Sequence, residues 1–238
     1  MGSKARLSKD IAPIINNLIV ENSINTYIEP FVGGANMMEH IICKNKIGYD
    51  NNHYLIEFWK AIQSGWTPND MITKEQYYTV KDNKDFFSPE IVALVGFCAS
   101  YNAKWFSGYA GEVKTKNGNI RNYYKEAVRN IMKQKNKLLN VSFETKDYRD
   151  VQANNCLIYC DPPYANTTKY GYDKGFNNEE FWDWVRKISK HNIVLISEYN
   201  APDDFECIFE KDIITTLDKN SRSRSTEKLY TYKHKQTF

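Results

Sequence analysis

The sequence predicts an α/β protein in which a mainly parallel sheet is interrupted by a mainly helical insertion. Strand-like and helix-like patterns alternate over residues 1–60 and again over residues 141–197, an order that builds a parallel sheet with crossover helices. Residues 61–140 show no comparable strand rhythm. We therefore expect an α/β domain formed by residues 1–60 and 141–238, and an insertion formed by residues 61–140.

The first half of the sheet is expected to be a βαβ unit. Ser8 or Asp10 can cap a first helix that runs to about Ile19, because apolar residues recur on one face at helical spacing. The elements expected next are a strand over residues 26–28, the segment Glu29-Pro30-Phe31-Val32-Gly33-Gly34, a helix over residues 35–44 and a strand over residues 46–49 that ends at Asp50.

The insertion carries helix and hairpin signals. A helix is expected from Ser88 to Ala103, with Pro89 at its first position, where an N–H has no partner within the helix. Asn117-Gly118 between short extended stretches predicts a β-hairpin. The second half of the sheet is then expected to contain strands over residues 141–143, 156–160 and 192–197 and a helix over residues 179–190.

Composition is that of a globular protein. Of 238 residues, 42% are apolar and 26% are charged. No apolar stretch approaches the roughly 18 residues that a membrane helix needs, and the first ten residues lack the apolar segment of a signal peptide. We therefore expect a cytoplasmic protein that does not attach to a membrane.

The cysteines and histidines do not suggest a disulfide framework or a metal site. Five cysteines are an odd number without a Cys-x-x-Cys pair, and the four histidines are scattered. Cys156 and Cys160 lie in an apolar run, where we expect them to be small buried hydrophobic residues. We expect no bound metal.

Positive charge is concentrated in two segments although the net charge is only +3. Residues 111–140 hold eight Lys or Arg against two Glu, and residues 219–238 hold six against one. Basic patches of this kind attract phosphate backbones. A solvated lysine-rich face is the alternative that charge alone leaves open.

A glycine pair after the first strand suggests a nucleoside-containing cofactor. Gly33 and Gly34 let the backbone approach a ligand closely, and Asp50 follows the second strand, where an acidic side chain can hold ribose hydroxyls. The segment lacks a full Gly-x-Gly-x-x-Gly pattern and has no Lys-Ser or Lys-Thr for a triphosphate. An ordinary tight turn is the alternative.

The stretch CLIYCDPPY, residues 156–164, places a carboxylate and two prolines at the end of a buried strand. Prolines fix φ and have no N–H, so Pro162 offers only a carbonyl acceptor, held rigidly beside the Asp161 carboxylate. Two acceptors can bind the two hydrogens of an amino group, and Tyr164 can stack on a base, which suits a flipped adenine or cytosine. A strand terminator is the alternative.

These motifs, in this order, resemble those of the Dam-like adenine-specific DNA methyltransferases of phages and bacteria, and the resemblance covers nearly the whole chain. The segment Glu29–Gly34 is similar to the S-adenosylmethionine loop of that family, and Asp161-Pro162-Pro163-Tyr164 matches its catalytic tetrapeptide without a substitution. The resemblance implies a Rossmann-like, S-adenosylmethionine-dependent methyltransferase sheet, with the insertion as the DNA target-recognition region.

The resemblance also implies a set of residues around S-adenosylmethionine, whose product is S-adenosylhomocysteine. The residues expected to bind the cofactor are Lys4, Phe31, Gly33, Gly34, Asp50, Asp147, Tyr148 and Asp161. For Phe31 a core position is the alternative, and for Asp147-Tyr148 a surface turn. Tyr170 and Phe176 are candidates for a loop over the flipped base.

A hairpin that reads DNA is implied at the basic part of the insertion. The residues that fall there are Lys114, Lys116, Asn117, Asn119 and Arg121. Arginine and asparagine suit guanine and adenine edges in the major groove, whereas lysines need only meet phosphates. Arg222 and Arg224 either hold phosphates or solvate a late loop.

The expected function is sequence-specific methylation of adenine in double-stranded DNA by a monomer or weak dimer. Asp161 and the Pro162 carbonyl would accept both hydrogens of the exocyclic amine, so that its nitrogen attacks the sulfonium methyl in line. Positioning and electrostatics supply the rate, without a covalent enzyme intermediate. The alternatives are the same transfer to an RNA base and a catalytically silent DNA-binding module.

Overall fold

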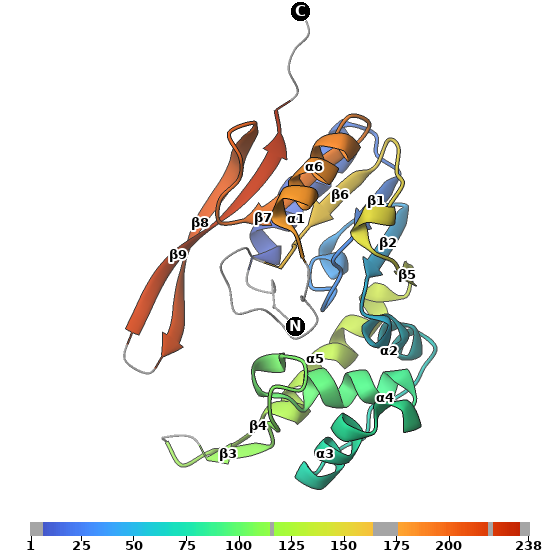
Figure 1. Cartoon of the computed structure of the whole chain (residues 1–238), viewed down its shortest axis with the longest axis vertical. Helices are drawn as coiled ribbons and strands as arrows, with labels where there is room; N and C mark the ends of the chain where they lie inside the picture. The colour runs from blue at the N-terminus through green and yellow to red at the C-terminus, as the bar shows by residue number, and fades with distance from the viewer. Residues whose placement is uncertain (1–6, 115–116, 164–175, 219–220, 234–238) are drawn as a thin grey trace, which may run out of the picture.

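The computed structural model describes residues 7–114, 117–163, 176–218 and 221–233, and over residues 213–225 the backbone alone (Figure 1). No helix in these ranges is long and apolar enough to cross a membrane.

A seven-stranded sheet forms the centre of the molecule, in the order β5-β2-β1-β6-β7-β9-β8. Its strands are β1 (Thr26–Glu29), β2 (Asn45–Asp50), β5 (Val141–Thr145), β6 (Leu157–Cys160), β7 (Ile193–Glu198), β8 (Phe205–Asp218) and β9 (Ser221–Tyr232). The first five in spatial order are parallel, and β9 is antiparallel to both β7 and β8. Strand order reverses between β1 and β6, as in doubly wound folds. The predicted Rossmann-like sheet is confirmed.

Helices cover both faces of this sheet. Successive strand residues point to opposite faces, so Tyr27 of β1 packs in one core cluster with α1 (Ser8–Glu21), while Ile28 packs in a second cluster with α6 (Asn178–Ile188).

Cys156 and Cys160 are 7% and 0% exposed, which confirms that they are buried.

The remaining helices and a small hairpin lie between β2 and β5 in the chain and form the lower part of Figure 1. They are α2 (His53–Gln63), α3 (Lys74–Asp82), α4 (Pro89–Ala93) and α5 (Tyr123–Leu138), with β3 (Glu112–Lys114) paired to β4 (Ile120–Asn122). The predicted hairpin is confirmed. The proposed boundary at residue 60 falls inside α2, and the assignment of residues 61–140 to target recognition stays a prediction.

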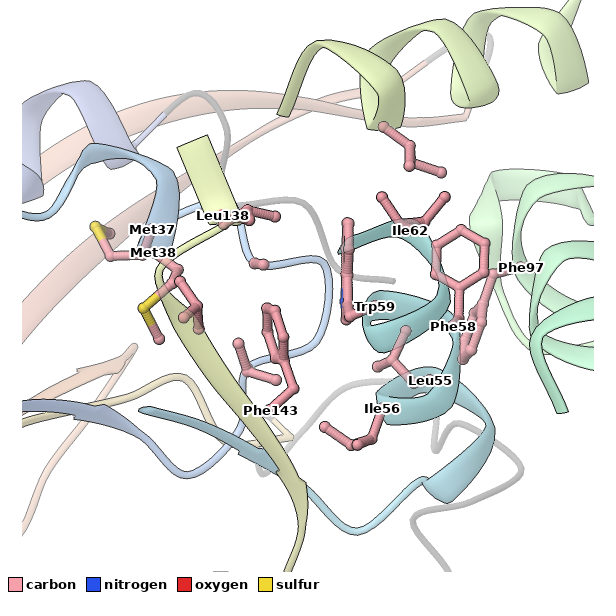
Figure 2. Packing of buried hydrophobic residues seen from close by; sticks show 14 of the residues in the cluster. Met37, Met38, Leu55, Ile56, Phe58, Trp59, Ile62, Phe97, Leu138 and Phe143 are labelled. Atoms are coloured by element: carbon pink, nitrogen blue, oxygen red, sulfur yellow. The ribbon is translucent and has the colours of Figure 1, made fainter. Parts of the chain in front are cut away.

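Helix α2 connects the sheet to the other helices. Figure 2 shows Trp59 of α2 facing Phe143 of β5, with ring centroids 6.0 Å apart, while Phe58 lies beside Phe97 from the helical part. All four belong to one continuous hydrophobic cluster. The position of the helical part is therefore fixed by core packing.

The expected helix over residues 35–44 is wrong. Only Met38–His40 form a short 3₁₀ turn, after Ala35 in a left-handed conformation (φ 51°). The Asn16 side chain donates to the His40 carbonyl and accepts from the Ile42 N–H, at 3.0 and 2.9 Å. These hydrogen bonds to α1 replace those that a helix would make, since tertiary contacts override local propensity.

The expected helix from Ser88 to Ala103 ends earlier. Pro89 does occupy its first position, but the α-helix stops at Ala93 and becomes a π-helix over Leu94–Cys98. A Cβ added to Gly96 would lie 2.6 Å from the Trp105 ring, so that ring closes directly over the widened turn. Single π turns of this kind are frequent at functional sites.

Two other features differ from expectation. Helix α1 begins at Ser8, but no side chain caps it, and its N-cap position is Leu7. The long β8–β9 hairpin was not expected, and Arg222 and Arg224 lie in strand β9 instead of a loop.

Candidate active site at the carboxyl edge of the sheet

Four segments singled out in the sequence follow neighbouring parallel strands at the same edge of the sheet. The glycine turn follows β1, Asp50 ends β2, Asp147-Tyr148 follows β5 and Asp161-Pro162-Pro163 follows β6. Strand order reverses between β1 and β6, and ligands of doubly wound folds bind outside the carboxyl ends of strands at that point. The structure therefore gathers these segments where a cofactor is expected.

The glycine turn is held by Asp50. The Gly33 N–H donates to Asp50 Oδ2 at 3.1 Å, and the Asn52 N–H donates to Oδ1 at 2.9 Å. Gly33 has φ +47°, a left-handed conformation that favours glycine. The carboxylate thus has a fixed orientation, and the turn leaves backbone close to it, as a nucleoside-binding site requires.

Two side chains from distant helices support the same turn. Trp59 Nε1 donates to the Gly33 carbonyl at 2.9 Å, and Gln134 Nε2 donates to the Gly34 carbonyl at 3.4 Å. Sequence reasoning missed both residues. No local signal marks them, because each lies in an unremarkable amphipathic helix and reaches the turn only through the tertiary fold.

An aromatic cluster lies beside the glycine turn. The Phe31 ring centroid is 5.3 Å from that of Tyr148 and 6.0 Å from that of Phe176. Burial, followed by the nearby Glu180 charge, raises the pKa of Tyr148 to about 12, so its hydroxyl stays protonated. Phe31 is partly buried and belongs to this cluster, which fits both interpretations offered for it.

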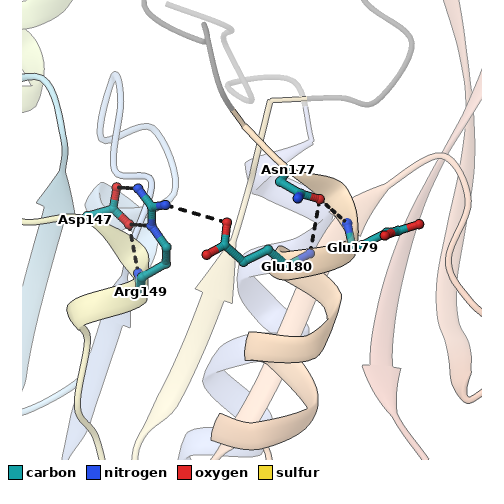
Figure 3. Close-up of polar contacts among 5 residues, drawn as sticks. All are labelled: Asp147, Arg149, Asn177, Glu179 and Glu180. Atoms are coloured by element: carbon teal, nitrogen blue, oxygen red, sulfur yellow. Dashed lines mark hydrogen bonds and ion pairs between the residues drawn. The ribbon is translucent and has the colours of Figure 1, made fainter.

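Asp147 is engaged in a surface ion-pair network. Its carboxylate accepts from Arg149 Nε and Nη2 at 2.7 and 2.9 Å, and Arg149 Nη1 lies 3.6 Å from Glu180 on α6 (Figure 3). Hydrogen bonding to Arg149 lowers the pKa of Asp147. Asn177 caps α6 through its Oδ1, which accepts from the N–H groups of Glu179 and Glu180. The network joins the segment after β5 to the start of α6.

The Asp161-Pro162-Pro163 segment leaves β6 at its carboxyl end. Asp161 and Pro163 are partly exposed and Pro162 is buried. Just before them, the buried Tyr159 hydroxyl lies 2.8 Å from Ser197 Oγ of β7, which joins the neighbouring strands beneath the turn. Tyr164, Tyr170, Lys4 and Lys116, which the sequence also singled out, lie outside the described residues.

Glu29, at the end of β1, is a buried carboxyl whose individual role sequence reasoning missed. It is 3% exposed, and Tyr27 Oη donates to its Oε1 at 2.9 Å. Burial first, and then the negative charge of Asp161, raise the pKa of Glu29 to about 8, although the Tyr27 hydrogen bond and the Lys46 charge act in the opposite direction. Its signal in the sequence was an acid at the end of an apolar strand, directly before the glycine segment.

The β3–β4 hairpin lies directly before the start of α5, whereas Gln134, farther along that helix, reaches the glycine turn at the edge. Lys114, Asn117, Asn119 and Arg121 are all exposed. Lys114 pairs with Ile120 and Arg121 pairs with Val113, so the two cations emerge on opposite faces of the ribbon. Helix α5 follows β4 directly and has 16 residues, which corresponds to a length of about 24 Å.

Side chains suited to metal binding do not gather in the described part of the chain. No group of three or more His, Cys, Asp or Glu residues there could hold an ion.

The parallel sheet, its antiparallel final strand and the segments at its carboxyl edge define a Rossmann-like methyltransferase fold. The chain belongs to the D12 class N6 adenine-specific DNA methyltransferase family, whose model matches residues 1–203.

Relatives in this family are distant. The chain is 25% identical over 251 residues to the type II methyltransferase M.MjaIII of Methanocaldococcus jannaschii, covering 88% of this chain and 86% of that protein. It is 24% identical over 211 residues to the type II methyltransferase M.FokI of Planomicrobium okeanokoites, and 26% identical over 208 residues to the modification methylase StsI of Streptococcus sanguinis. These two alignments cover 78% and 77% of this chain, which spans 31% and 30% of the two proteins.

Solved structures resemble the chain only loosely. PH1948 of Pyrococcus horikoshii has a TM-score of 0.44 at 8% identity, covering 95% of this chain and 82% of that one. The Thermoplasma acidophilum protein 1320 has a TM-score of 0.42 at 10% identity, with complete coverage of both chains.

Proposed function

We propose that the chain transfers a methyl group from S-adenosylmethionine to the exocyclic amino group of an adenine flipped out of double-stranded DNA. The observation that carries this proposal is the meeting of two motifs at one sheet edge. The glycine turn fixed by Asp50 and the Asp161-Pro162-Pro163 turn follow strands β1 and β6, which are hydrogen-bonded neighbours.

The amine of adenine is a poor nucleophile because its lone pair is delocalised into the ring. The Asp161 carboxylate and the Pro162 carbonyl would accept its two hydrogens and favour a tetrahedral nitrogen. Pro162 is suited to this because its ring fixes φ, so its carbonyl holds one direction. The lone pair would then form a bond to the methyl carbon that S-adenosylmethionine supplies, with a neutral thioether as the leaving group, and the amine would afterwards lose one proton.

The residues around the glycine turn fit the proposed cofactor. When bound, S-adenosylmethionine supplies a methyl group on a positively charged sulfur. Asp50 would accept from ribose hydroxyls, since its carboxylate is already oriented by Gly33 and Asn52. Phe31 and Tyr148 offer apolar surface next to the turn. Lys4 and Tyr164 remain proposed contacts, and the monomer or weak dimer remains a proposed state.

The basic segment of residues 111–140 supports duplex DNA as the substrate. Neutralising phosphates with lysine and arginine releases counterions, so we expect affinity to fall steeply with salt concentration. The β3–β4 ribbon is of a size that a major groove admits. Lys114, Lys116, Asn117, Asn119 and Arg121 remain its proposed DNA contacts.

The test is transfer of a labelled methyl group to DNA. The chain is incubated with methyl-labelled S-adenosylmethionine and duplex DNA, which is then digested and separated into nucleosides. We expect label in N6-methyladenine, abolished by Asp161→Ala. The matched control is Asp183→Ala, because Asp183 is an exposed acid whose contact is Arg186 on its own helix.

Other outcomes would identify the alternatives. Label transferred to RNA but not to DNA would favour an RNA base as substrate. Salt-sensitive DNA binding without transfer to either nucleic acid would favour a silent binding module. Near-normal transfer by Asp161→Ala would contradict the mechanism.

A further inference from the structure

Three side chains at the junction of β4 and α5 form one interacting group. Arg121 Nε donates to Glu126 Oε1 and Arg121 Nη2 donates to Glu126 Oε2, both at 2.8 Å. The Arg121 guanidinium also lies over the Tyr123 ring, 4.6 Å from its centroid. One face of the guanidinium and one of its edges are therefore held by neighbours in the same short segment.

The geometry of arginine determines what this arrangement can bind. A guanidinium has five N–H donors in a planar fork. Glu126 takes the side edge formed by Nε and Nη2, which leaves the end edge, formed by Nη1 and the outer N–H of Nη2, directed away from that carboxylate. Two parallel donors on one edge match O6 and N7 of guanine in the major groove, the commonest base-specific contact of arginine.

The hairpin presents this group on one face of a two-stranded ribbon. Arg121 pairs with Val113, and both residues are exposed. Lys114 emerges on the opposite face with Ile120. A ribbon placed in a groove turns one face to the base edges. The face that carries Arg121 holds a donor suited to a base edge. Lys114, on the other face, is a cation that can bind a phosphate without reading a base.

We propose that Arg121 reads a guanine in the recognition sequence through its end edge and that Glu126 is the positioning residue that orients it. This inference rests on the proposed function, because it requires a DNA substrate. It selects one base reader among the five candidate hairpin residues and assigns Glu126, which lies outside that set, a part in sequence specificity.

A purely structural role for Glu126 makes a different prediction. An acidic residue in the first turn of α5 stabilises the helix by interacting with the helix dipole, whether or not it orients Arg121. That role would alter folding stability and leave the choice of sequence unchanged. The decisive measurement is therefore the methylated sequence itself, and not stability or overall activity.

The experiment maps methylated adenines by single-molecule sequencing of DNA from cells that express each variant. Arg121→Ala should tolerate any base at one guanine position of the wild-type motif, with discrimination there reduced on the order of ten- to hundredfold. Arg121→Lys should behave similarly, because an ammonium has no planar fork. Glu126→Gln should relax the same position to a smaller extent and no other.

Two variants provide matched controls. Glu112→Gln removes a carboxylate from the same hairpin whose contact is the Asn122 amide, at 3.3 Å, and should leave the motif unchanged. Lys114→Ala should weaken binding to all sequences about equally. It should also reduce the slope of log affinity against log salt concentration by about one. Far-ultraviolet circular dichroism shows whether each variant is folded.

A chemical probe gives an independent test with the purified chain. Replacing the mapped guanine by 7-deazaguanine in a short duplex removes the N7 acceptor. The wild type should lose kcat/KM with this duplex, and Arg121→Ala should lose little more, because the two changes remove the same contact.

The outcomes separate the two proposals. An unchanged motif in Arg121→Ala, alongside normal methylation by the wild type, would overturn the assignment of Arg121 and leave the proposed function intact. Relaxation in Arg121→Ala but not in Glu126→Gln would overturn the role of Glu126. A wild-type chain that methylates no DNA would overturn both proposals.

Discussion

The carboxyl edge of the sheet and the β3–β4 hairpin differ in how the side chains proposed to be functional are held. At the edge, Gly33 and Asp50 are fixed by hydrogen bonds from residues of other elements, over a buried core. On the hairpin, the Arg121 side chain contacts Glu126 and Tyr123 from its own stretch of chain and remains half exposed. If the proposed roles hold, the chemistry is built on the core, whereas recognition is placed where residues can change without unfolding the protein.

The largest difference should appear in folding stability. Trp59 is 1% exposed and supports the glycine turn, so Trp59→Ala should lower the free energy of unfolding by about 3–5 kcal/mol. The hairpin counterpart, Ile120→Ala, should change it by less than about 0.5 kcal/mol because Ile120 is 72% exposed. Urea denaturation measures both. Equal losses would contradict the comparison.

A second difference should appear in the pH dependence of stability. The pKa of Glu29 is raised to about 8 in the folded chain from an ordinary value near 4.5. At pH values between 4.5 and 8, Glu29 is ionised in the unfolded chain but still protonated in the folded chain. The free energy of unfolding should therefore fall by several kcal/mol as pH rises towards 8 and then level off. Glu29→Gln should remove this fall.

Glu126 on α5 should behave in the opposite sense. Hydrogen bonding to Arg121 lowers the pKa of Glu126, so its contribution is present above the ordinary pKa and is lost only as pH falls below it. Glu126→Gln should leave the fall between pH 5 and 8 as it is in the wild type. Urea denaturation of both variants at several pH values would show whether Glu29→Gln removes the fall in stability while Glu126→Gln leaves it unchanged.

Two left-handed glycines, Gly33 and Gly118, allow a matched comparison. Gly33 has φ +47° in the turn at the edge, and Gly118 has φ +81° in the hairpin with nothing within 4 Å of an added Cβ. Alanine at either position should cost about 1–2 kcal/mol of stability, because each must adopt a strained backbone conformation. In calorimetric titration, Gly33→Ala alone should weaken binding of S-adenosylmethionine. Equal affinity in both variants would remove the turn from the cofactor site.

The smallest effect is expected at Gln134. Its Nε2 donates to the Gly34 carbonyl at 3.4 Å, and a single hydrogen bond contributes about 0.5–1.5 kcal/mol, with long ones at the lower end. Gln134→Leu keeps the side-chain volume and should weaken cofactor binding two- to fivefold, roughly the equivalent of that energy. Lys133→Leu, one position earlier on the helix, is the control. Matching affinities would show that the contact does not position the turn.

Most of the sheet could be predicted from the sequence, and so could the segments that gather at its carboxyl edge, because both follow local rules. Buried parallel strands read as short apolar runs, and glycine, proline and acidic residues at their ends mark turns that approach a ligand. What could not be predicted depends on distant partners. The segment after Gly34 failed to become a helix because Asn16 satisfies its backbone groups, and Trp59 and Gln134 reach the turn from separate helices.

The order of segments along the chain also constrains how the sheet can form during synthesis. Strand β2 pairs with β5, so that Lys46 lies opposite Val141, and β1 pairs with β6, so that Tyr27 lies opposite Leu157. The whole helical part must leave the ribosome before either pairing closes, and such non-local pairing slows folding. The outer edges of strands β1 and β2 therefore stay unpaired until the helical part has been made, and the carboxyl edge that carries the candidate site can assemble only after that.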